Sequence, residues 1–475
     1  MTDTKVTTWE TVIGLEVHCE LATATKLFCG CRNAFGDEPN TNVCPVCLGL
    51  PGSLPVVNRR AVEFAMRIGE ALHCTVQRSI FHRKNYFYPD MPKDYQVSQY
   101  DLPINVAGSL ELPDGTRVGI TRAHMEEDTG KTSHIGGGGR IHEAGYALVD
   151  YNRAGVPLVE IVSEPDIRSA REAHDYVTEL RAILAAIGVS DVKMEEGSLR
   201  VDANVSLRPE GSTGFGTRCE IKNLNSLRSL IRALEYEARR QAEILEAGDA
   251  VVQETRHWNE EQGRTHSLRS KEEAFDYRYF PEPDLVPVEP SDEWRAEVRS
   301  SLPVLPAQRR ALLAAEVGAE AAGDVAVVIE RGLDGLVRAA IAAGADPHRA
   351  ITHAVHNMKV EGATELHADA FARLVRMETD GQLTATQAKQ VLAEMLDRGG
   401  DPAAIAADLG FEAMDQDALA AVVDQLIADN PDDFERLKGG DQKVMGFFVG
   451  QAMKATQGNA DGKAVTTLLR ERAAG

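Results

Sequence analysis

Short stretches in which apolar and polar residues alternate constrain the fold of this chain more than any other feature. They occupy residues 11–21, 157–166, 198–208 and 217–223, the second less regularly than the others. In the first stretch, Glu16, His18 and Glu20 alternate with apolar side chains. Because successive side chains of a strand point to opposite faces, we expect strands with one apolar and one polar face. Such strands are typical of an antiparallel sheet that is packed on one side.

Two helices are expected to cover the apolar face of that sheet. Ser169 and Glu172 have the spacing of a capping box, and Gly188 marks the end of the helix that follows. A second helix is expected from about Ser226 to Gly248, with its apolar residues on one stripe. Strands and helices together predict an α+β fold.

The chain is acidic and has an ordinary globular composition. Its 475 residues suggest about three domains at roughly 150 residues each. A formal net charge of −22 argues against DNA binding, although a local basic patch could contact RNA. We find neither a long apolar run nor an apolar N-terminal segment. We therefore expect a cytoplasmic protein with no membrane span and no secretory signal.

Proline and glycine mark two predicted domain boundaries. Residues 281–290 are rich in proline, which breaks helices and central strands, so we expect a linker there. Long stretches with helical periodicity follow, and glycines near residues 400–410 divide them. The predicted domains are residues 1–290, 291–405 and 406–475.

Four cysteines occur as two close pairs, Cys29 with Cys31 and Cys44 with Cys47. Four thiolates on two tight turns can converge on one zinc ion in a tetrahedral arrangement. Because the protein would supply all four ligands, we expect a structural and not a catalytic metal. The alternative is a set of unrelated buried thiols, but the paired spacing favours zinc.

A second group of residues is rich in carboxylates. Glu16 and His18 share one strand face, and the segment 124–134 (HMEEDTGKTSH) adds His124, Glu126, Glu127, Asp128 and Lys131. Glu160 and Asp202 contribute carboxylates on other strands. Clustered carboxylates suit magnesium with phosphate oxygens and water, which is the arrangement for phosphoryl transfer from ATP. The alternative is that the acidic triplet forms a solvated loop.

Two further regions carry basic residues. In residues 81–99, Arg83, Lys84 and Lys93 are interleaved with tyrosines and a phenylalanine, a mixture that can hold phosphates while aromatic rings stack on bases. Residues 401–433 have acidic but no basic residues, whereas residues 434–475 have an excess of basic ones, among them Lys443, Lys454 and Lys463. Such a local basic region indicates contact with a polyanion, and a solvated loop or helix face is the alternative for both regions.

Long motifs spread along the chain resemble the B subunits of tRNA-dependent amidotransferases, the GatB/GatE family. The motifs are VIGLEVHCEL, TKLFCGC, NTNVCPVCLGLPGSLPVVN, RKNYFYPDMPKDYQVSQ, HMEEDTGKTSH, GVPLVEIVSEPDIRS, GVSDVKMEEGSLRVDANVSL, IKNLNSLRSL, FDYRYFPEPDL and QKVMGFFVGQAMKAT. The resemblance runs from Thr11 to the C-terminus. No large insertion separates the mixed and helical regions, so the chain is closer to the bacterial B form than to the archaeal E form.

The resemblance implies an ATP-dependent ligase. Proteins of this family phosphorylate the side-chain carboxylate of glutamate on tRNA(Gln), or of aspartate on tRNA(Asn), and ammonia then converts the acyl phosphate to the amide. The ammonia comes from a partner amidase, the A subunit, which hydrolyses glutamine, and a small C subunit completes the heterotrimer. The implied fold is a catalytic cradle similar to glutamine synthetase, followed by a helical domain and a small YqeY-like tail that contact tRNA.

The resemblance also assigns residues. It implies a magnesium set of His18, Glu127 and Glu160, with Glu16, Glu126 and Asp202 as neighbours around the nucleotide phosphates. Weaker candidates for holding phosphate or carboxylate are Lys84, Lys93, Lys131, Arg200 and Lys222. Cys29, Cys31, Cys44 and Cys47 match zinc knuckles, and the basic residues of the tail match a tRNA-contacting region that is less basic here than usual.

Two other functions stay open on the sequence alone. One is a zinc-stabilised tRNA-binding scaffold without catalysis, which would tolerate loss of the carboxylates. The other is a free-standing ligase that acts on a small metabolite and needs no tRNA.

Overall fold

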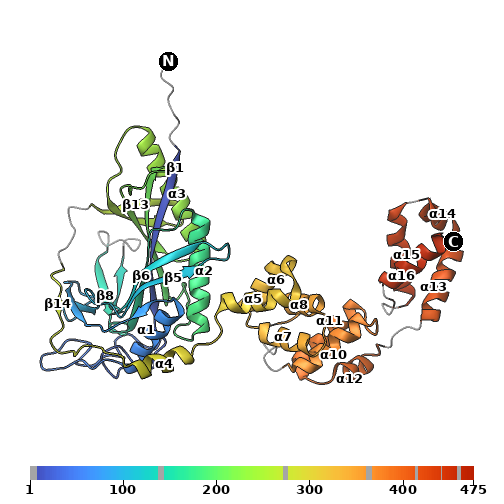
Figure 1. Ribbon diagram of the computed structural model, residues 1–475, viewed down its shortest axis with the longest axis horizontal. Helices are drawn as coiled ribbons and strands as arrows, with labels where there is room; N and C mark the ends of the chain where they lie inside the picture. The colour runs from blue at the N-terminus through green and yellow to red at the C-terminus, as the bar shows by residue number, and fades with distance from the viewer. Residues whose placement is uncertain are drawn as a thin grey trace, which may run out of the picture. The chain divides into compact units, whose positions relative to one another are not determined.

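The computed structural model describes residues 8–136, 144–270, 277–359, 366–411, 416–439, 441–456, 460 and 462–474. The chain divides into two compact units, Met1–Pro306 and Ala307–Gly475 (Figure 1). The first unit mixes strands and helices and the second is helical, so the α+β prediction is confirmed at this level.

Most strands of the first unit form one large sheet. The strands are β1 (Trp9–Glu20), β2 (Thr75–Val76), β3 (His82–Asn85), β4 (Tyr95–Ser98), β5 (Asn105–Glu111), β6 (Arg117–Glu127), β7 (Lys131–Ile135), β8 (Tyr146–Asp150), β9 (Pro157–Ser163), β10 (Leu199–Pro209), β11 (Cys219–Leu224), β12 (Glu254–Asn259), β13 (Arg264–Ser270) and β14 (Phe280–Pro281). The order across the sheet is β13-β12-β11-β10-β1-β9-β6-β4-β3-β14, with β5 and β2 beside β6. Strands β11 and β12 run parallel, and the other pairs among the described strands are antiparallel. Strands β7 and β8 form a separate two-stranded ribbon.

The helices of the first unit cover the apolar face of this sheet. They are α1 (Arg59–Ala71), α2 (Ala170–Ala186), α3 (Leu227–Glu246) and α4 (Asp292–Ser300). Figure 1 shows α2 and α3 against the sheet, where α3 contacts β10 and β11. The odd-numbered side chains of β1 from Ile13 to Cys19 are fully buried beneath these helices. The period-two pattern thus decides which face each strand packs.

Both predicted helices form, and their first turns show why. Ser169 precedes α2, and its hydroxyl accepts a hydrogen bond from the backbone N–H of Glu172 at 3.1 Å. The Glu172 carboxylate accepts the backbone N–H of Arg168 at 2.9 Å, one residue earlier than in the standard capping box. Ser226 caps α3 in the same way through Ser229.

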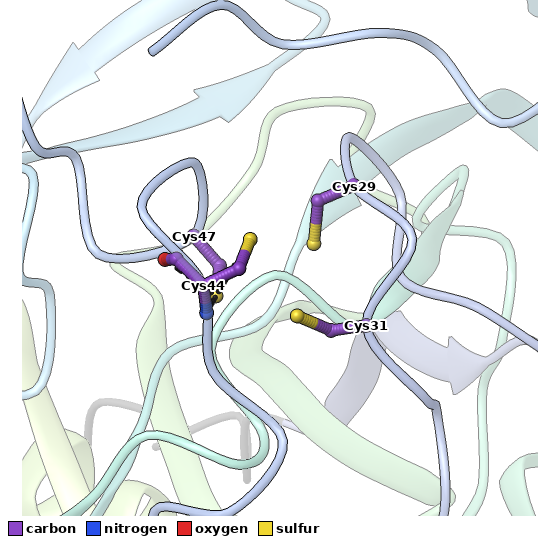
Figure 2. Close-up of side chains that lie close together, drawn as sticks. All are labelled: Cys29, Cys31, Cys44 and Cys47. Carbon is purple, nitrogen blue, oxygen red and sulfur yellow. Dashed lines mark hydrogen bonds between the residues drawn. The ribbon is translucent and has the colours of Figure 1, made fainter.

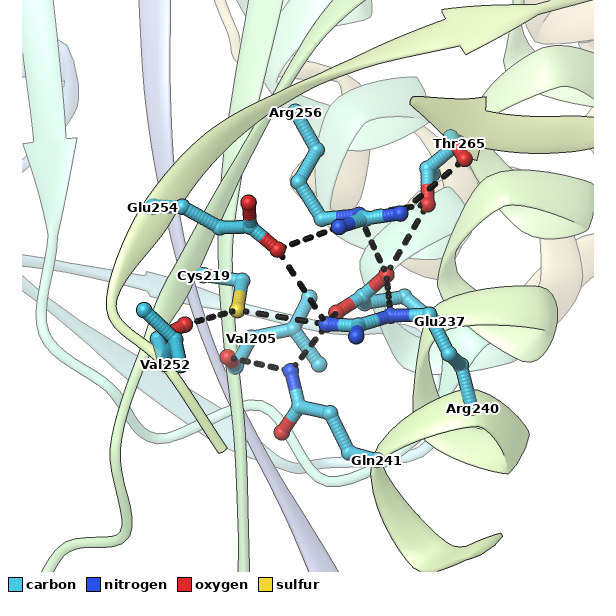
Figure 3. A network of polar contacts seen from close by, with 9 residues as sticks. All are labelled: Val205, Cys219, Glu237, Arg240, Gln241, Val252, Glu254, Arg256 and Thr265. Carbon is cyan, nitrogen blue, oxygen red and sulfur yellow. Dashed lines mark hydrogen bonds and ion pairs between the residues drawn. The ribbon is translucent and has the colours of Figure 1, made fainter. Parts of the chain in front are cut away.

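A buried network of polar side chains attaches α3 to strands β10–β13 (Figure 3). The carboxylate of Glu237, which is fully buried, pairs with Arg240 at 2.6 Å and lies 3.5 Å from Arg256. Gln241 donates to the Glu237 carboxylate and to the backbone carbonyl of Val205. Several partners therefore share the one buried carboxylate, which satisfies its need for hydrogen bonds.

The proline-rich segment 281–290 is not a linker. Glu282 is buried and accepts hydrogen bonds from Arg83 on β3 at 2.6 and 2.9 Å, and Val288 forms a bridge with Ser79. Helix α4 then packs on α1, so the first compact unit extends to Pro306. Regular structure here is confined to the end of β14 and the Val288 bridge, and the side chains between them still contact the sheet edge.

The second unit is built from short helices. They are α5 (Pro306–Val317), α6 (Ala322–Glu330), α7 (Asp334–Ala342), α8 (Pro347–His356), α10 (Ala368–Thr379), α11 (Ala385–Arg398), α12 (Pro402–Asp408), α13 (Gln416–Asp429), α14 (Pro431–Lys438), α15 (Gln442–Ala455) and α16 (Gly462–Ala474), with a 3₁₀ turn at Ala319–Ala321. Two separate hydrophobic clusters lie within it, one from Leu313 to Ala406 and one from Leu419 to Leu469. None of the described helices combines the length and apolar character that a membrane span requires. The three-domain division of the chain stays a prediction.

Candidate functional site

Strand register gathers polar side chains from four strands on the face opposite the helices. His18 on β1 lies opposite Arg200 on β10 and opposite Glu160 on β9, and Glu160 in turn lies opposite His124 on β6. Residues that are directly opposite in a sheet share a face. The alternation within single strands therefore becomes one continuous polar surface.

At the centre of this surface, His18, Glu126 and Glu160 each direct one ligand atom to a common point, and these atoms lie within 4.8 Å of one another. The distance from His18 Nδ1 to Glu126 Oε1 is 3.3 Å, and from His124 Nε2 to Glu160 Oε2 it is 3.2 Å. The three side chains are 19%, 6% and 14% exposed, so the solvated-loop alternative fails for Glu126. The buried Nδ1 atom of His18 has only this Glu126 contact, and no hydrogen-bond partner is found among the described residues for the buried Nδ1 atom of His124.

Charged groups in this cluster shift one another's pKa values. Burial lowers the pKa of His18, but Glu126, Glu160 and Asp202 outweigh it and raise the pKa to about 9. Burial disfavours the charged form of Glu160, yet His124 and His18 hold the pKa of Glu160 well below its usual range. Two carboxylates and an imidazole around one point are a donor set that a divalent cation can complete once the imidazole loses its proton.

Further polar residues surround the cluster. Asp202 binds Lys222 at 2.6 Å, and Lys222 also binds Glu220 at 2.8 Å. Glu16 accepts a hydrogen bond from Asn204 at 2.9 Å, and burial raises the pKa of Glu16. Arg200 pairs with the buried Asp128 at 3.0 Å. Cationic groups thus lie beside the carboxylates, as the binding of a polyphosphate requires.

Glu127 does not lie in the cluster to which the resemblance assigned it. As the neighbour of Glu126 on β6 it points to the other side, where its carboxylate pairs with Lys93 and accepts the backbone N–H of Val97 at 2.8 Å. Both side chains line a cavity of about 60 Å³ together with Lys26, Cys47 and Tyr95. The three residues whose ligand atoms converge are therefore His18, Glu126 and Glu160. Glu126 and not Glu127 belongs to this set because successive side chains of β6 point to opposite faces.

The other predicted phosphate-binding lysines are dispersed. Lys84 on β3 places its ammonium 4.8 Å from the centre of the Tyr277 ring. Lys131 lies exposed at the start of the β7–β8 ribbon. Lys443 and Lys454 are exposed on α15, and the side chain of Lys463 lies outside the described residues.

The two cysteine pairs converge as their spacing predicts. The sulfur atoms of Cys29, Cys31, Cys44 and Cys47 lie within 4.8 Å of one another and point to a common centre (Figure 2). The Cys44 and Cys47 sulfurs are 3.9 Å apart, close to the ~3.8 Å edge of a tetrahedron with ~2.3 Å zinc–sulfur bonds. A hydrogen bond from Cys29 lowers the pKa of Cys47 to about 5, which favours the thiolate that binds metal. The cluster could hold a metal ion, and its geometry is consistent with structural zinc.

An aromatic group outside the predicted site residues lies near the same face. The rings of Tyr100 and Tyr279 stack with centroids 4.1 Å apart, and Tyr277 meets Tyr279 edge-on. Tyr277 and Tyr279 belong to the FDYRYFPEPDL motif, where three aromatic residues within five positions could have signalled them. Their proximity to the carboxylates depends on pairing between distant strands, which no local pattern reveals.

Comparison with known proteins gives consistent matches along the chain. Residues 11–296 match the family model of the GatB/GatE catalytic domain, and residues 350–472 match a YqeY-type model described as the GatB domain. The chain is 52% identical to the B subunit of the aspartyl/glutamyl-tRNA(Asn/Gln) amidotransferase of Frankia casuarinae, over 98% of this chain and 95% of the relative. It is 47% identical to the protein of that name from Thermoanaerobacter sp. strain X514, over 98% and 99% of the two chains. For the Thermobifida fusca relative of the same name the identity is 49%, over 98% and 94%.

Proposed function

Since the chain belongs to the GatB/GatE family of amidotransferase B subunits, we propose that it amidates Glu-tRNA(Gln), Asp-tRNA(Asn) or both at the expense of ATP. The convergence of His18, Glu126 and Glu160 on one buried polar face carries this proposal. A scaffold that only bound tRNA would have no use for two carboxylates and a histidine whose ligand atoms converge in this way.

The proposed reaction has two steps. A carboxylate oxygen of the tRNA-bound amino acid attacks the γ-phosphorus of ATP, and ADP departs, which leaves an acyl phosphate. Ammonia then attacks the carbonyl carbon, the carbon–oxygen bond to phosphate breaks, and the nitrogen loses a proton to give the amide. Arg200 and Lys222 lie where they can offset the negative charge of the phosphates and the incoming carboxylate.

The donor set fits a divalent cation such as magnesium. His18, Glu126 and Glu160 would hold the ion, with Glu16 and Asp202 nearby. Magnesium binds through few carboxylates and keeps its remaining positions for water and phosphate oxygens, where it neutralises charge as phosphate is transferred. Asp202 lies 3.9 Å from Nε2 of His18, and it can orient the imidazole through that contact.

The four-cysteine cluster is proposed to bind zinc as a structural ion. Residues 1–290 would form a glutamine-synthetase-like catalytic cradle, residues 291–405 a helical domain and residues 406–475 a YqeY-like tail. In the tail, Lys443, Lys454 and Lys463 would contact the tRNA backbone, which carries negative charge.

The relatives are each named as one component of an amidotransferase, which supports a multi-subunit enzyme. We place two partners beside this chain, a glutaminase (the A subunit of the family) as the source of ammonia and the small C subunit. We place the complex in the cytoplasm, where translation takes place.

The experiment is an ATP turnover assay with the purified complex and magnesium. ADP should form with misacylated tRNA and not with free glutamate or uncharged tRNA. Ammonium chloride should replace glutamine when this chain is assayed without a glutaminase. Turnover with the free amino acid would indicate a metabolite ligase, and unchanged activity of Glu160→Gln would indicate that the polar face is not catalytic.

A further inference from the structure

A row of paired residues extends across the sheet from the carboxylate cluster to a group of tyrosines. Glu126 on β6 lies opposite Ser98 on β4, Ser98 lies opposite His82 on β3, and His82 lies opposite Pro281 on β14. Tyr100 follows Ser98 by two residues, and Tyr279 precedes Pro281 by two. Both tyrosines lie just outside their strands, and Tyr100 meets the ring of His82 edge-on, so the tyrosines adjoin the face that presents Glu126.

The tyrosine rings form a braced flat surface. Tyr100 and Tyr279 are stacked with an interplanar angle of 6°, and Tyr277 meets Tyr279 at 73°. The buried His82 supports Tyr100 from the side with a ring-centroid distance of 6.2 Å. Tyr100 is nevertheless 55% exposed, so the stack is open to solvent. An exposed aromatic stack held in a fixed orientation is suited to binding another flat ring.

The stack lies within electrostatic range of the cation site. Burial raises the pKa of Tyr279, and the carboxylates of Glu126 and Glu160 raise it further. One strand spacing of about 4.8 Å and a two-residue rise of about 6.7 Å separate the backbone of Glu126 from that of Tyr100, a distance of roughly 8 Å. In a nucleotide a single ribose joins the base to the phosphates. The separation between Glu126 and Tyr100 is of the same order as the distance from base to phosphates.

We propose that Tyr100, Tyr277 and Tyr279 form the platform on which the adenine ring of ATP stacks. The proposal rests on the proposed function and adds the base-binding part of the same site. The platform and the cation site share one face, so both ends of a nucleotide can be bound without a change in the sheet. The ammonium of Lys84 lies over the Tyr277 ring and adds positive charge at that side of the platform.

A second stacked pair provides a matched control. Tyr86 and Tyr88 stack with centroids 4.9 Å apart in the loop after β3, and Tyr88 is 44% exposed. This pair has the same chemistry as the platform but belongs to the loop between β3 and β4.

The test is calorimetric binding to the assembled enzyme with magnesium, using ATP and, separately, tripolyphosphate, which has no base. Tyr100→Ala and Tyr279→Ala should each weaken ATP binding by roughly 5- to 150-fold, the range for loss of one base–aromatic stack. Tyr279→Phe and Tyr88→Ala should bind ATP as the wild type does. Tripolyphosphate should bind equally to all variants, which would show that the cation site is intact.

Three results would overturn the platform while leaving the proposed function in place. They are unchanged ATP binding by both alanine variants, an equal loss of ATP and tripolyphosphate binding, and a raised KM for misacylated tRNA with unchanged ATP binding. The last result would assign the stack to the terminal adenosine of tRNA. Failure of the wild-type enzyme to bind either ligand would overturn both the platform and the proposed function.

Discussion

Glu126 and Glu127 are adjacent in the chain, yet their carboxylates lie on opposite sides of the sheet. Glu126 lies 3.3 Å from His18 in the polar cluster, whereas Glu127 pairs with Lys93 beside the cavity. The side chains of Lys93 and Glu127 are 9% and 3% exposed, so this ion pair is nearly dry. One peptide bond therefore separates a candidate metal ligand from a structural ion pair.

This arrangement predicts opposite phenotypes for two similar variants. Glu126→Gln removes a ligand, and we expect Mn²⁺ affinity, measured by electron paramagnetic resonance, to fall at least ~10- to 100-fold. Glu127→Gln leaves a buried ammonium unpaired, so it should lower the free energy of unfolding by about 3–5 kcal/mol and leave Mn²⁺ affinity unchanged. The double variant Lys93→Met/Glu127→Gln should recover much of that stability. If Glu127→Gln lost the ion and kept its stability, the two assignments would be reversed.

Removal of zinc should destabilise the first unit. Chelation, or Cys44→Ser, leaves the two turns that carry the cysteines without the ion that joins them. We expect the free energy of unfolding to fall by about 4 kcal/mol, in the range for loss of a metal site. Thermal denaturation with and without chelator measures this, and metal analysis should give one zinc per chain. Cys74→Ser, at a half-buried thiol outside the cluster, is the control and should still bind zinc. A chain that contained no zinc and melted identically with chelator would contradict the assignment.

Glu237 should be among the most sensitive positions of the fold. Glu237→Gln removes the charge that Arg240 and Arg256 share, and we expect a loss of about 3–5 kcal/mol in urea denaturation. Glu235→Gln, on the exposed side of the same helix, should change stability by less than ~0.5 kcal/mol. Equal effects of the two substitutions would show that the network in Figure 3 adds nothing beyond helix propensity.

The helical unit should lose local stability in acid through Glu378. Its carboxylate binds His353 at 2.6 Å and also pairs with Arg349. Burial disfavours the charged carboxylate, but His353 and Arg349 hold the pKa of Glu378 below its ordinary value. A lowered pKa stabilises the fold above the unfolded-state value of about 4.3, and this stabilisation is lost as the pH falls through the folded-state pKa.

Hydrogen exchange of α8 and α10 in the full chain measures this effect. Glu378→Gln should lower protection at pH 7 by about 1–3 kcal/mol, and the difference from wild type should shrink as the pH falls below about 4.3. A constant difference across that range would show that the carboxylate's charge is not what stabilises the contact.

The parts of this fold that depend on local pattern could be predicted from the sequence. Alternation around Glu16 and His18 predicts a strand with a polar face, the Ser169 cap predicts the start of α2, and the spacing of Cys29 to Cys47 predicts their convergence. Each of these relations extends over a short stretch of the chain. The packed face follows from the same pattern, because burial of apolar side chains stabilises the sheet.

Long-range pairing could not be predicted in this way. Whether Glu126 or Glu127 faces His18 depends on the register between β6, β9 and β1, and no local pattern states which strands are neighbours. The proline-rich segment has the composition of a linker, and the contact from Glu282 to Arg83 that makes it part of the first unit joins residues 199 positions apart. The stack of Tyr100 on Tyr279 is of the same kind.

The most direct test of the central claim is the fate of the substrate's own carboxylate oxygen. Glu-tRNA(Gln) with ¹⁸O in the glutamate side chain is incubated with the complex, ATP, magnesium and ammonium chloride, and the released phosphate is analysed by mass spectrometry. Transfer of the γ-phosphate to that carboxylate predicts one ¹⁸O atom in each phosphate, and no phosphate above background from Glu160→Gln. Amide formation with unlabelled phosphate would contradict the account.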